Sequence, residues 1–325
     1  MDAIGLCVQR LVKEMEDILR KDIFCGIEFS DVVPEWEELA DDPTNSQVGA
    51  SIFNHPSNPF AADEHALSRA ILDQTALGGL LVRKEEGGTL VYSTEEISRY
   101  FGIIEKFKQK LYVSTHLGSG MPARGGEEVY HQYANSTTRL RNMTVFWGQE
   151  CIVGQYNKTT NNTRRDKIIL RAAPKPVTRM MVIYLSRVRP LEMMLLKGVV
   201  PSEHFEDIYG RYRTHIWIGP RGLYTYKRFS DWLGEELEVE LGTRYGLSDM
   251  RNIMIGFFKK AITNNVVRSS VAYEELLETI GDMQAGHSSE VAIVHYARDS
   301  NAATEVPEPI LKQQLMVSGQ ISFGT

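Results

Sequence analysis

Cysteine is scarce in this chain, and long apolar runs are absent from it. The three cysteines, Cys7, Cys25 and Cys151, are odd in number and far apart, which predicts reduced thiols in an intracellular compartment. Charged residues or glycine interrupt each apolar run within about a dozen residues, so we expect no membrane-spanning helix. The N-terminal residues mix acidic and basic side chains and lack the order of a secretion signal.

Two motifs that bind cofactors are also missing. The sequence contains no phosphate-binding P-loop and no carboxylate triad with metal-ligand spacing. We therefore expect no metal ion and no cofactor.

The residues that are present suit a globular protein of one large or two medium domains. The 325 residues are 42% hydrophobic and 24% charged, which is enough apolar material for an ample core. We predict an α+β fold that is mostly helical. A helical N-terminal domain is expected over residues 1–112, a second domain with a small antiparallel sheet over residues 113–300, and a tail over residues 301–325.

The first predicted domain contains several helix signals. Apolar residues recur at helical spacing and predict a helix over residues 1–22. An irregular acidic arm follows up to about residue 61. A helix is then expected over residues 62–77, ended by the glycines at 78–79, with a turn at 87–88. Ser93 and Glu96 form a capping-box pattern that predicts the start of a helix reaching Leu111.

The second predicted domain begins with strand signals. Residues 142–147 and 151–156 alternate as two strands of a hairpin, and residues 167–170 follow as a third strand after a polar loop at 157–166. Helices are expected over residues 174–196, 227–241 and 273–283, and from Ser248 onward. A Gly-His-Ser-Ser turn at residues 286–289 then runs into an apolar segment that ends near Tyr296.

Charge is distributed unevenly along the chain. The net charge of −6 argues against nucleic-acid binding, yet basic residues dominate positions 139–189, where only Glu150 and Asp166 oppose them. This stretch predicts a face that binds a polyanion. The alternative is ordinary solvated surface. The candidate DNA contacts are Arg139, Arg141, Arg164, Arg165, Lys167 and Arg171.

Six further residues occur in an informative order. Arg124 is followed three residues later by Glu127, Lys158 follows a predicted strand, Arg251 lies at a helix start, and His287 precedes Tyr296 by nine residues. Over roughly residues 112–300 this order resembles the tyrosine recombinase family, the phage integrases and their relatives. The run over residues 107–192 also resembles the integrase-like regions of fungal mobile-element proteins, some of which are joined to a helicase.

The resemblance implies a DNA breaking and joining enzyme that forms a 3′-phosphotyrosyl intermediate without a metal ion. A phosphodiester gains charge during attack on phosphorus, and two guanidinium groups can clamp it by bidentate bonds. Arg124 and Arg251 are the expected clamp, and Tyr296 is the expected nucleophile. Lys158 is the expected general acid and His287 a hydrogen-bond donor to the phosphate. Glu127 is expected to orient Arg124 or a neighbouring group.

The sequence departs from the family pattern in two places. Pro122 stands where the first motif usually has glycine, and Ser248 stands where the His-x-x-Arg motif has histidine. Asp249 or His295 is then a candidate proton acceptor, and Arg164, Arg165 and Lys167 are rivals of Lys158. Each arginine or histidine also has an ordinary alternative as a helix cap, a surface ion pair or a packed side chain.

The expected partner is double-stranded DNA, gripped mainly through its phosphates and therefore in a salt-dependent way. Recombination joins two sites, so we expect a homo-oligomer of two or four copies on DNA, with the tail as a candidate exchange element. We expect no membrane association and, in a eukaryote, a nuclear location. Two alternatives stay open: a DNA-binding or scaffolding relative with impaired catalysis, and a type IB topoisomerase-like enzyme that acts as a monomer.

Overall fold

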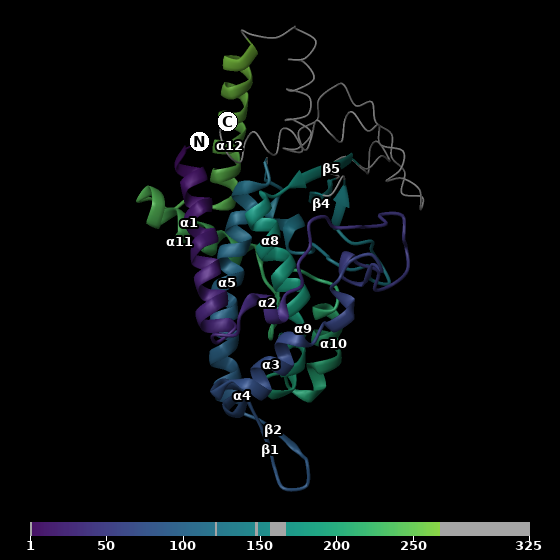
Figure 1. Cartoon of the computed structure of the whole chain (residues 1–325). Coiled ribbons are helices and arrows are strands. Elements are labelled where there is room, and N and C mark those ends of the chain that lie inside the picture. Colours follow the sequence, from purple (N-terminus) through teal and green to yellow (C-terminus); the bar gives the residue numbers. More distant parts are fainter. Residues whose placement is uncertain (1, 121, 147–148, 157–166, 267–325) are drawn as a thin grey trace.

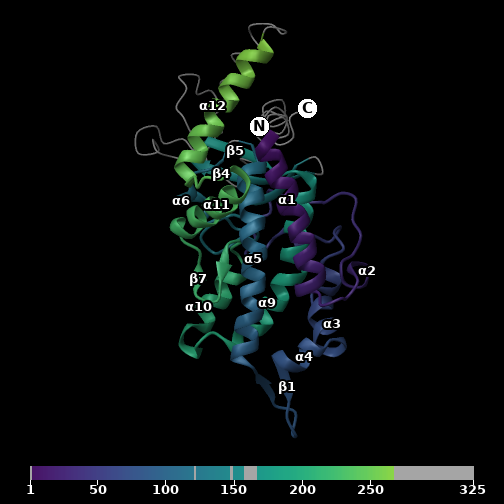
Figure 2. The same ribbon diagram turned by 90° about the vertical axis from the view of Figure 1, so that its left-hand side faces the viewer.

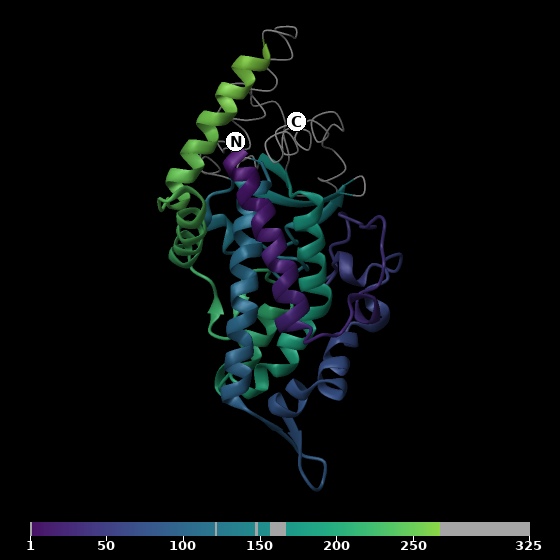
Figure 3. The same cartoon turned by 60° about the vertical axis from the view of Figure 1, so that its left-hand side comes forward.

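The computed structural model describes residues 2–120, 122–146, 149–156 and 167–266, and a bundle of long helices forms its centre. Helix α1 (Asp2–Ile18) continues into the π-helical turn η1 (Leu19–Ile23) and packs along α5 (Thr94–Gly118), as Figure 1 and Figure 3 show. Helix α8 (Lys175–Ile183), the π-helical turn η4 (Tyr184–Val188) and α9 (Arg189–Leu195) form a second continuous run that packs on both helices through α8. The helices predicted over residues 1–22 and 174–196 are confirmed.

Apolar spacing and a cap explain these helices. Val8, Leu11 and Met15 lie on one face of α1 and are buried in the bundle, which stabilises the fold by about 1.5–3 kcal/mol for each side chain. The Ser93 hydroxyl accepts a hydrogen bond from the Glu96 backbone N–H at 3.4 Å. The predicted helix start at Ser93 is therefore confirmed.

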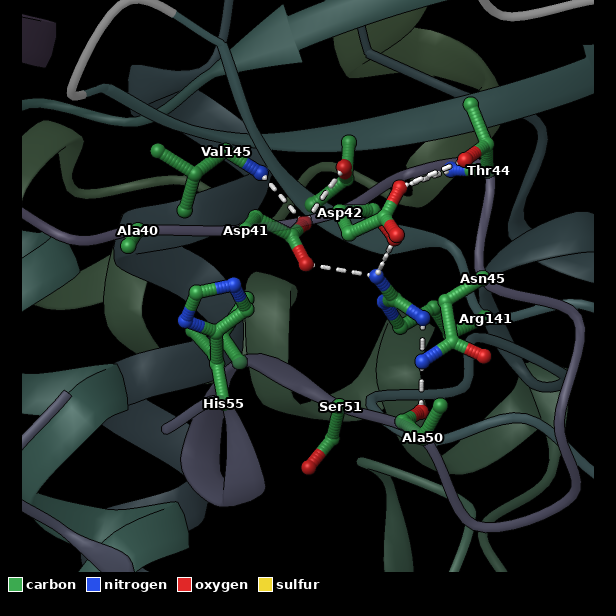
Figure 4. Close-up of polar contacts among 12 residues, drawn as sticks. Ala40, Asp41, Asp42, Thr44, Asn45, Ala50, Ser51, His55, Arg141 and Val145 are labelled. Carbon is green, nitrogen blue, oxygen red and sulfur yellow. Dashed lines mark hydrogen bonds and ion pairs between the residues drawn. The ribbon is translucent and has the colours of Figure 1, made fainter. Parts of the chain in front are cut away.

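The irregular arm expected after α1 is also present. It contains only the short helices α2 (Phe29–Val32), η2 (Ile52–Asn54) and η3 (Ala61–Asp63). Asp41 fixes the arm to the sheet, as Figure 4 shows. Its carboxylate accepts hydrogen bonds from Arg141 at 2.5 Å, from the Thr144 hydroxyl at 2.7 Å and from the Val145 backbone N–H at 3.0 Å.

Two short helices and a hairpin complete the N-terminal part. Helix α3 (Ala66–Gln74) is followed directly by α4 (Ala76–Leu81), so the glycines at 78–79 lie inside a helix and the prediction that they end one is wrong. Thr75 separates the two helices because its hydroxyl accepts a hydrogen bond from the Gly78 N–H at 3.2 Å. Strands β1 (Val82–Lys84) and β2 (Leu90–Tyr92) then pair across the predicted turn, where both glycines have positive φ.

The predicted three-stranded antiparallel sheet is confirmed. Strand β4 (Gln149–Tyr156) lies between β3 (Met143–Phe146) and β5 (Lys167–Ala172). The register places Thr144 opposite Cys151 and Ile152 opposite Arg171. Cys151, with its thiol buried, packs with Leu170 beneath the sheet.

The remaining elements cover one side of the bundle. They are α6 (Gly125–Glu128), η5 (Leu196–Gly198), α10 (Ser202–Tyr212), the small hairpin β6 (Ile218–Gly219) and β7 (Gly222–Leu223), α11 (Tyr226–Leu241) and α12 (Leu247–Val266). Figure 2 shows α6, α11, the sheet and the start of α12 together at one end of the molecule.

One hydrophobic core connects the two predicted domains. Residue 112, the predicted boundary, lies inside α5, and the same core contains side chains from Ile4 to Met254. The described residues therefore pack around one core on both sides of that position. The mostly helical α+β class with small antiparallel sheets is confirmed. No described helix is long and apolar enough to cross a membrane.

Candidate active site

The candidate site begins at Arg124, which forms the N-cap of α6 in extended conformation. The next residue, Gly125, lets two other helices approach closely. A Cβ atom at Gly125 would lie 2.6 Å from Tyr226 Cδ2 of α11 and 2.7 Å from Leu247 Cδ1 of α12. Glycine is therefore needed for α11 and α12 to close around the start of α6.

Three guanidinium groups are close enough to Glu127 for their charges to act on its carboxylate. Burial raises the pKa of Glu127, while the positive charges of Arg171, Arg124 and Arg251 act in the opposite direction. These arginines come from α6, β5 and α12, so three distant segments supply charge to one place. The Glu127 Oε1 atom is buried and has no hydrogen-bond partner among the described residues.

Arg171 belongs to strand β5 of the three-stranded sheet. Its side chain lies across Gly154 on the neighbouring strand, where a Cβ atom would collide with the guanidinium. Burial lowers the pKa of Arg171 to about 10, and the negative charges of Glu127 and Glu128 limit the change. Arg171 was predicted as a DNA contact, but its side chain is almost fully buried, at 5% exposure, and it faces Glu127 instead.

Arg251 faces Arg124 from the first turns of α12. Burial lowers the pKa of Arg251, and the nearby positive charge of Arg124 lowers it further. Ser248 and Asp249 lie one turn earlier and are both exposed. The Ser248 hydroxyl is 3.2 Å from the Tyr226 hydroxyl, and Asp249 accepts a hydrogen bond from the Gly246 N–H at 3.2 Å.

A buried polar network supports α6 from the bundle side. Glu128 accepts a hydrogen bond from the Tyr112 hydroxyl and lies 2.8 Å from His116 Nδ1. Burial acts to raise the pKa of Glu128, but His116 outweighs this and the pKa is lowered. This network fixes the helix that carries Arg124 and Glu127.

His131 lies one turn after Glu128 and is also buried. Burial lowers the pKa of His131 to about 4 despite the nearby Glu128 carboxylate, and Arg171 lowers it further. A cavity of about 20 Å³ lies between His116, His131 and Arg171, large enough for one water molecule. Among the described residues, these side chains do not form a group that could hold a metal ion.

Several predicted site residues lie outside the described residues. These are Lys158, Arg164, Arg165, His287, His295 and Tyr296. Lys167 is the first residue of β5, opposite Tyr156 in the register. Of the five predicted catalytic residues, the structure therefore locates Arg124 and Arg251 and places them close enough for their charges to interact.

Among the described residues of the basic stretch 139–189, some side chains are buried and others are exposed. Arg141 is buried and paired with Asp41, so it is removed from the predicted DNA contacts. Arg187 and Arg189 are buried as well, and Arg189 donates to the Tyr212 carbonyl at 2.9 Å. Arg139, Lys175 and Arg179 are exposed. Amino-acid composition could not distinguish the buried arginines from the exposed ones, because both contribute the same formal charge.

Sequence reasoning missed the supporting residues of the site. Tyr112, His116, Glu128 and His131 were not singled out, although Glu128 directly follows Glu127. The sequence did contain a signal for Glu128, because two adjacent acidic residues at the start of a short helix point to different faces. The bonding partners of Glu128 on α5 are far away in the sequence and gave no local pattern.

A second, larger cavity lies away from this site. It is an open groove of about 1100 Å³ between the arm, α9 and α10. Phe53, Tyr133, Met193, Phe205 and Tyr209 are among its lining residues.

Comparison with protein-family models finds no match for this chain. Comparison with solved structures finds no match either.

Proposed function

We propose that this protein breaks and rejoins DNA strands by the chemistry of the tyrosine recombinases. The observation that supports the proposal is that Arg124 and Arg251, from α6 and α12, lie close enough for their charges to act on each other and on Glu127. The two arginines are far apart in the chain, and with Arg171 they bring three positive charges near one carboxylate, Glu127. A phosphate between them would neutralise the repulsion.

The chemistry assigns a role to each described residue. Arg124 and Arg251 bind the equatorial oxygens of the scissile phosphate and stabilise the charge that develops there. The positive charge of Arg171 also acts on Glu127, so in this proposal Arg171 is a positioning residue that stabilises the Glu127 carboxylate. In this proposal Tyr296 attacks phosphorus and passes its phenolic proton to Asp249 or His295. Lys158 protonates the leaving 5′ oxygen, and His287 donates a hydrogen bond to the phosphate. The attack forms a phosphotyrosyl bond and breaks the P–O5′ bond, and the reverse step rejoins the strand.

The partners and location follow from the same proposal. The substrate is double-stranded DNA, two or four copies act on two sites, and the protein works in the nucleus if the source is eukaryotic. Because phosphate contacts supply much of the affinity, DNA binding should weaken steeply with salt.

A second candidate function is DNA binding without cleavage. Ser248 occupies the expected histidine position, and its hydroxyl is directed at Tyr226. A serine has no side-chain group that takes up a proton near neutral pH. A type IB topoisomerase-like enzyme is a variant of the first candidate and would relax supercoiled plasmid as a monomer.

The decisive experiment uses a pool of nicked DNA duplexes with random flanking sequence. A cleaving enzyme becomes trapped as an SDS-stable adduct, because the short strand beyond the nick diffuses away. We expect an adduct for the natural protein, none for Tyr296→Phe, and a reduction of about 100-fold or more for Arg124→Ala and Arg251→Ala. After digestion, mass spectrometry should find the nucleotide on the peptide that contains Tyr296.

The matched control is Arg99→Ala. Arg99 is exposed on α5 and pairs only with Glu95 and Glu96 on the same helix. The Arg99→Ala substitution removes the same charge as Arg124→Ala or Arg251→Ala without touching the candidate site. No adduct, together with DNA affinity that falls for Arg124→Ala but not for Arg99→Ala, would favour the binding-only candidate. No adduct and equal DNA affinity for both variants would refute both functions.

A further inference from the structure

The β1–β2 hairpin extends beyond the body of the protein. Figure 1, Figure 2 and Figure 3 all show it below α4, at the opposite end from the sheet and α12. Its second strand carries Leu90 at 52% exposure and Val91 at 41% exposure. Adjacent strand residues point to opposite faces, so each face of β2 carries an exposed apolar side chain.

Hydrogen bonding within the hairpin leaves the outer edge of β2 open. Glu85 N–H donates to the Thr89 carbonyl at 2.9 Å, and Ser93 N–H donates to the Leu81 carbonyl at 3.0 Å. Bonded pairs alternate in an antiparallel ladder, so Val91 bonds to β1 while the backbone groups of Leu90 and Tyr92 face outward. Within the described part of the chain, neither residue's N–H has a recorded acceptor.

The two edges of the hairpin differ in charge. The β1 edge carries Arg83 and Lys84 and is followed by Glu85 and Glu86. Charged side chains on an edge strand prevent it from pairing with another strand. Residues 89–93, which include β2, contain no charge at all. The hairpin therefore has one protected edge and one edge suited to pairing.

We propose that β2 pairs antiparallel with β2 of a second copy of this chain, forming a four-stranded sheet across a two-fold axis. With the axis at Val91, this residue faces its own copy, and Leu90 of each chain faces Tyr92 of the other. Leu90 and Tyr92 then exchange backbone hydrogen bonds, and all facing side chains are apolar or aromatic. This contact is a β-augmentation between identical strands.

Charge does not oppose pairing with a second copy. In the four-stranded sheet the two β1 strands are outermost and about 14 Å apart, three times the strand spacing. This distance exceeds the Debye length of about 8 Å at physiological salt, so their like charges are screened. Strands of three residues make a small interface, and the dimer should therefore form reversibly with increasing concentration.

The test is sedimentation velocity of the full chain across a concentration series. We expect the average mass to rise toward that of a dimer. Val91→Lys should raise the dissociation constant at least tenfold, because it places two lysines directly opposite each other. Leu90→Pro should do the same, since it removes an outward N–H that takes no part in the hairpin. Leu80→Lys, the same kind of change at a 44% exposed leucine of α4, should have no effect.

Disulfide trapping tests the register. In a Cys25→Ser background, the two remaining cysteines, Cys7 and Cys151, are buried. Val91→Cys should form a disulfide-linked dimer within minutes of mild oxidation, whereas Arg83→Cys should not, because its copies lie too far apart to bond. A chain that stays monomeric at all concentrations overturns the proposal. Equal dissociation constants for Val91→Lys and Leu80→Lys, or equal yields of disulfide-linked dimer for Val91→Cys and Arg83→Cys, also overturn it. The assays contain no DNA, so their results are independent of the proposed DNA chemistry.

Discussion

Protonation of His131 should make the free energy of unfolding depend on pH. The imidazole is 5% exposed and lies on the cavity beneath the candidate site, and its pKa falls from an ordinary 6.5 to about 4 because burial disfavours the charged form. The folded protein therefore keeps His131 neutral at pH values where the unfolded chain takes up a proton. The stability that neutral His131 contributes is complete above pH 6.5 and is lost as the pH falls toward 4.

The size of the effect follows from the pKa difference. Each pKa unit corresponds to about 1.4 kcal/mol, so His131 should remove about 3 kcal/mol of stability between pH 6.5 and 4. His131→Gln removes the titrating group and keeps a polar side chain of similar length. The free energy of unfolding of this variant should therefore not show the His131-linked decrease between pH 6.5 and 4, whatever its absolute value at pH 7.

Glu150 on β4 acts with the opposite sign and must be measured beside His131. Burial raises the pKa of Glu150 from 4.5 to about 7, although a hydrogen bond from Thr178 acts against the rise. Its contribution is complete below pH 4.5 and decreases by about 3 kcal/mol as the pH rises through 7. In the natural protein the two effects nearly cancel between pH 4.5 and 6.5. Each single substitution should therefore expose the other.

The assay is urea unfolding at half-unit steps from pH 4.5 to 7.5. Relative to the natural protein, His131→Gln should become less stable with rising pH, and Glu150→Gln should become more stable with rising pH. His204→Gln is the control, because His204 is exposed on α10. If His131→Gln and His204→Gln give parallel curves, the neutral buried state of His131 is refuted.

Three further predictions concern packing around the site and the arm. Gly125→Ala should cost about 1–3 kcal/mol in urea unfolding because its methyl group meets the α11 tyrosine ring, whereas Gly126→Ala, with nothing within 4 Å of the added carbon, should cost no stability. A cost shared by both variants would contradict the close approach. Asp41→Ala should cost about 3–5 kcal/mol because it leaves a buried arginine without its ion pair, and it should expose the arm to limited proteolysis. Asp42→Ala, which removes hydrogen bonds from neighbouring Thr44 to an exposed carboxylate, should stay within about 1 kcal/mol of the natural protein. Equal proteolysis of the two variants would exclude a role for Asp41 in fixing the arm. Gly154→Ala should displace the β5 guanidinium and weaken DNA binding, measured by fluorescence anisotropy at fixed salt, and unchanged affinity would exclude a role for that arginine in arranging the site.

Local patterns in the sequence were sufficient for most of the secondary structure. The helical spacing in α1, the capping pair at Ser93 and the alternation in β3 and β4 depend on neighbouring residues, which the sequence displays directly. The exception in the first half is α4. Its glycines suggested a break, but the hydrogen bond that the Gly78 N–H donates to the Thr75 hydroxyl and the packing of Leu81 hold a short helix there.

Whether each charged residue is buried or exposed depended on the tertiary structure. Nothing in the sequence near Arg141 distinguishes it from Arg139, yet one is buried against Asp41 and the other is exposed. The same applies to Lys108 of α5, whose ammonium is fully buried and donates to Glu192 at 2.7 Å. Burial of a charge requires a partner that is usually far away in the chain, and its position is known only once the helices have packed.

The sequence by itself determined which residue types could form a phosphate clamp and in what order they occur along the chain. Only the tertiary structure decided that Arg124 and Arg251 meet, that Arg171 joins them from the sheet, and that Glu128 holds the helix beneath. The physical reason is that helix and strand formation depend on local spacing, whereas a cluster of like charges depends on long-range packing that overcomes their repulsion.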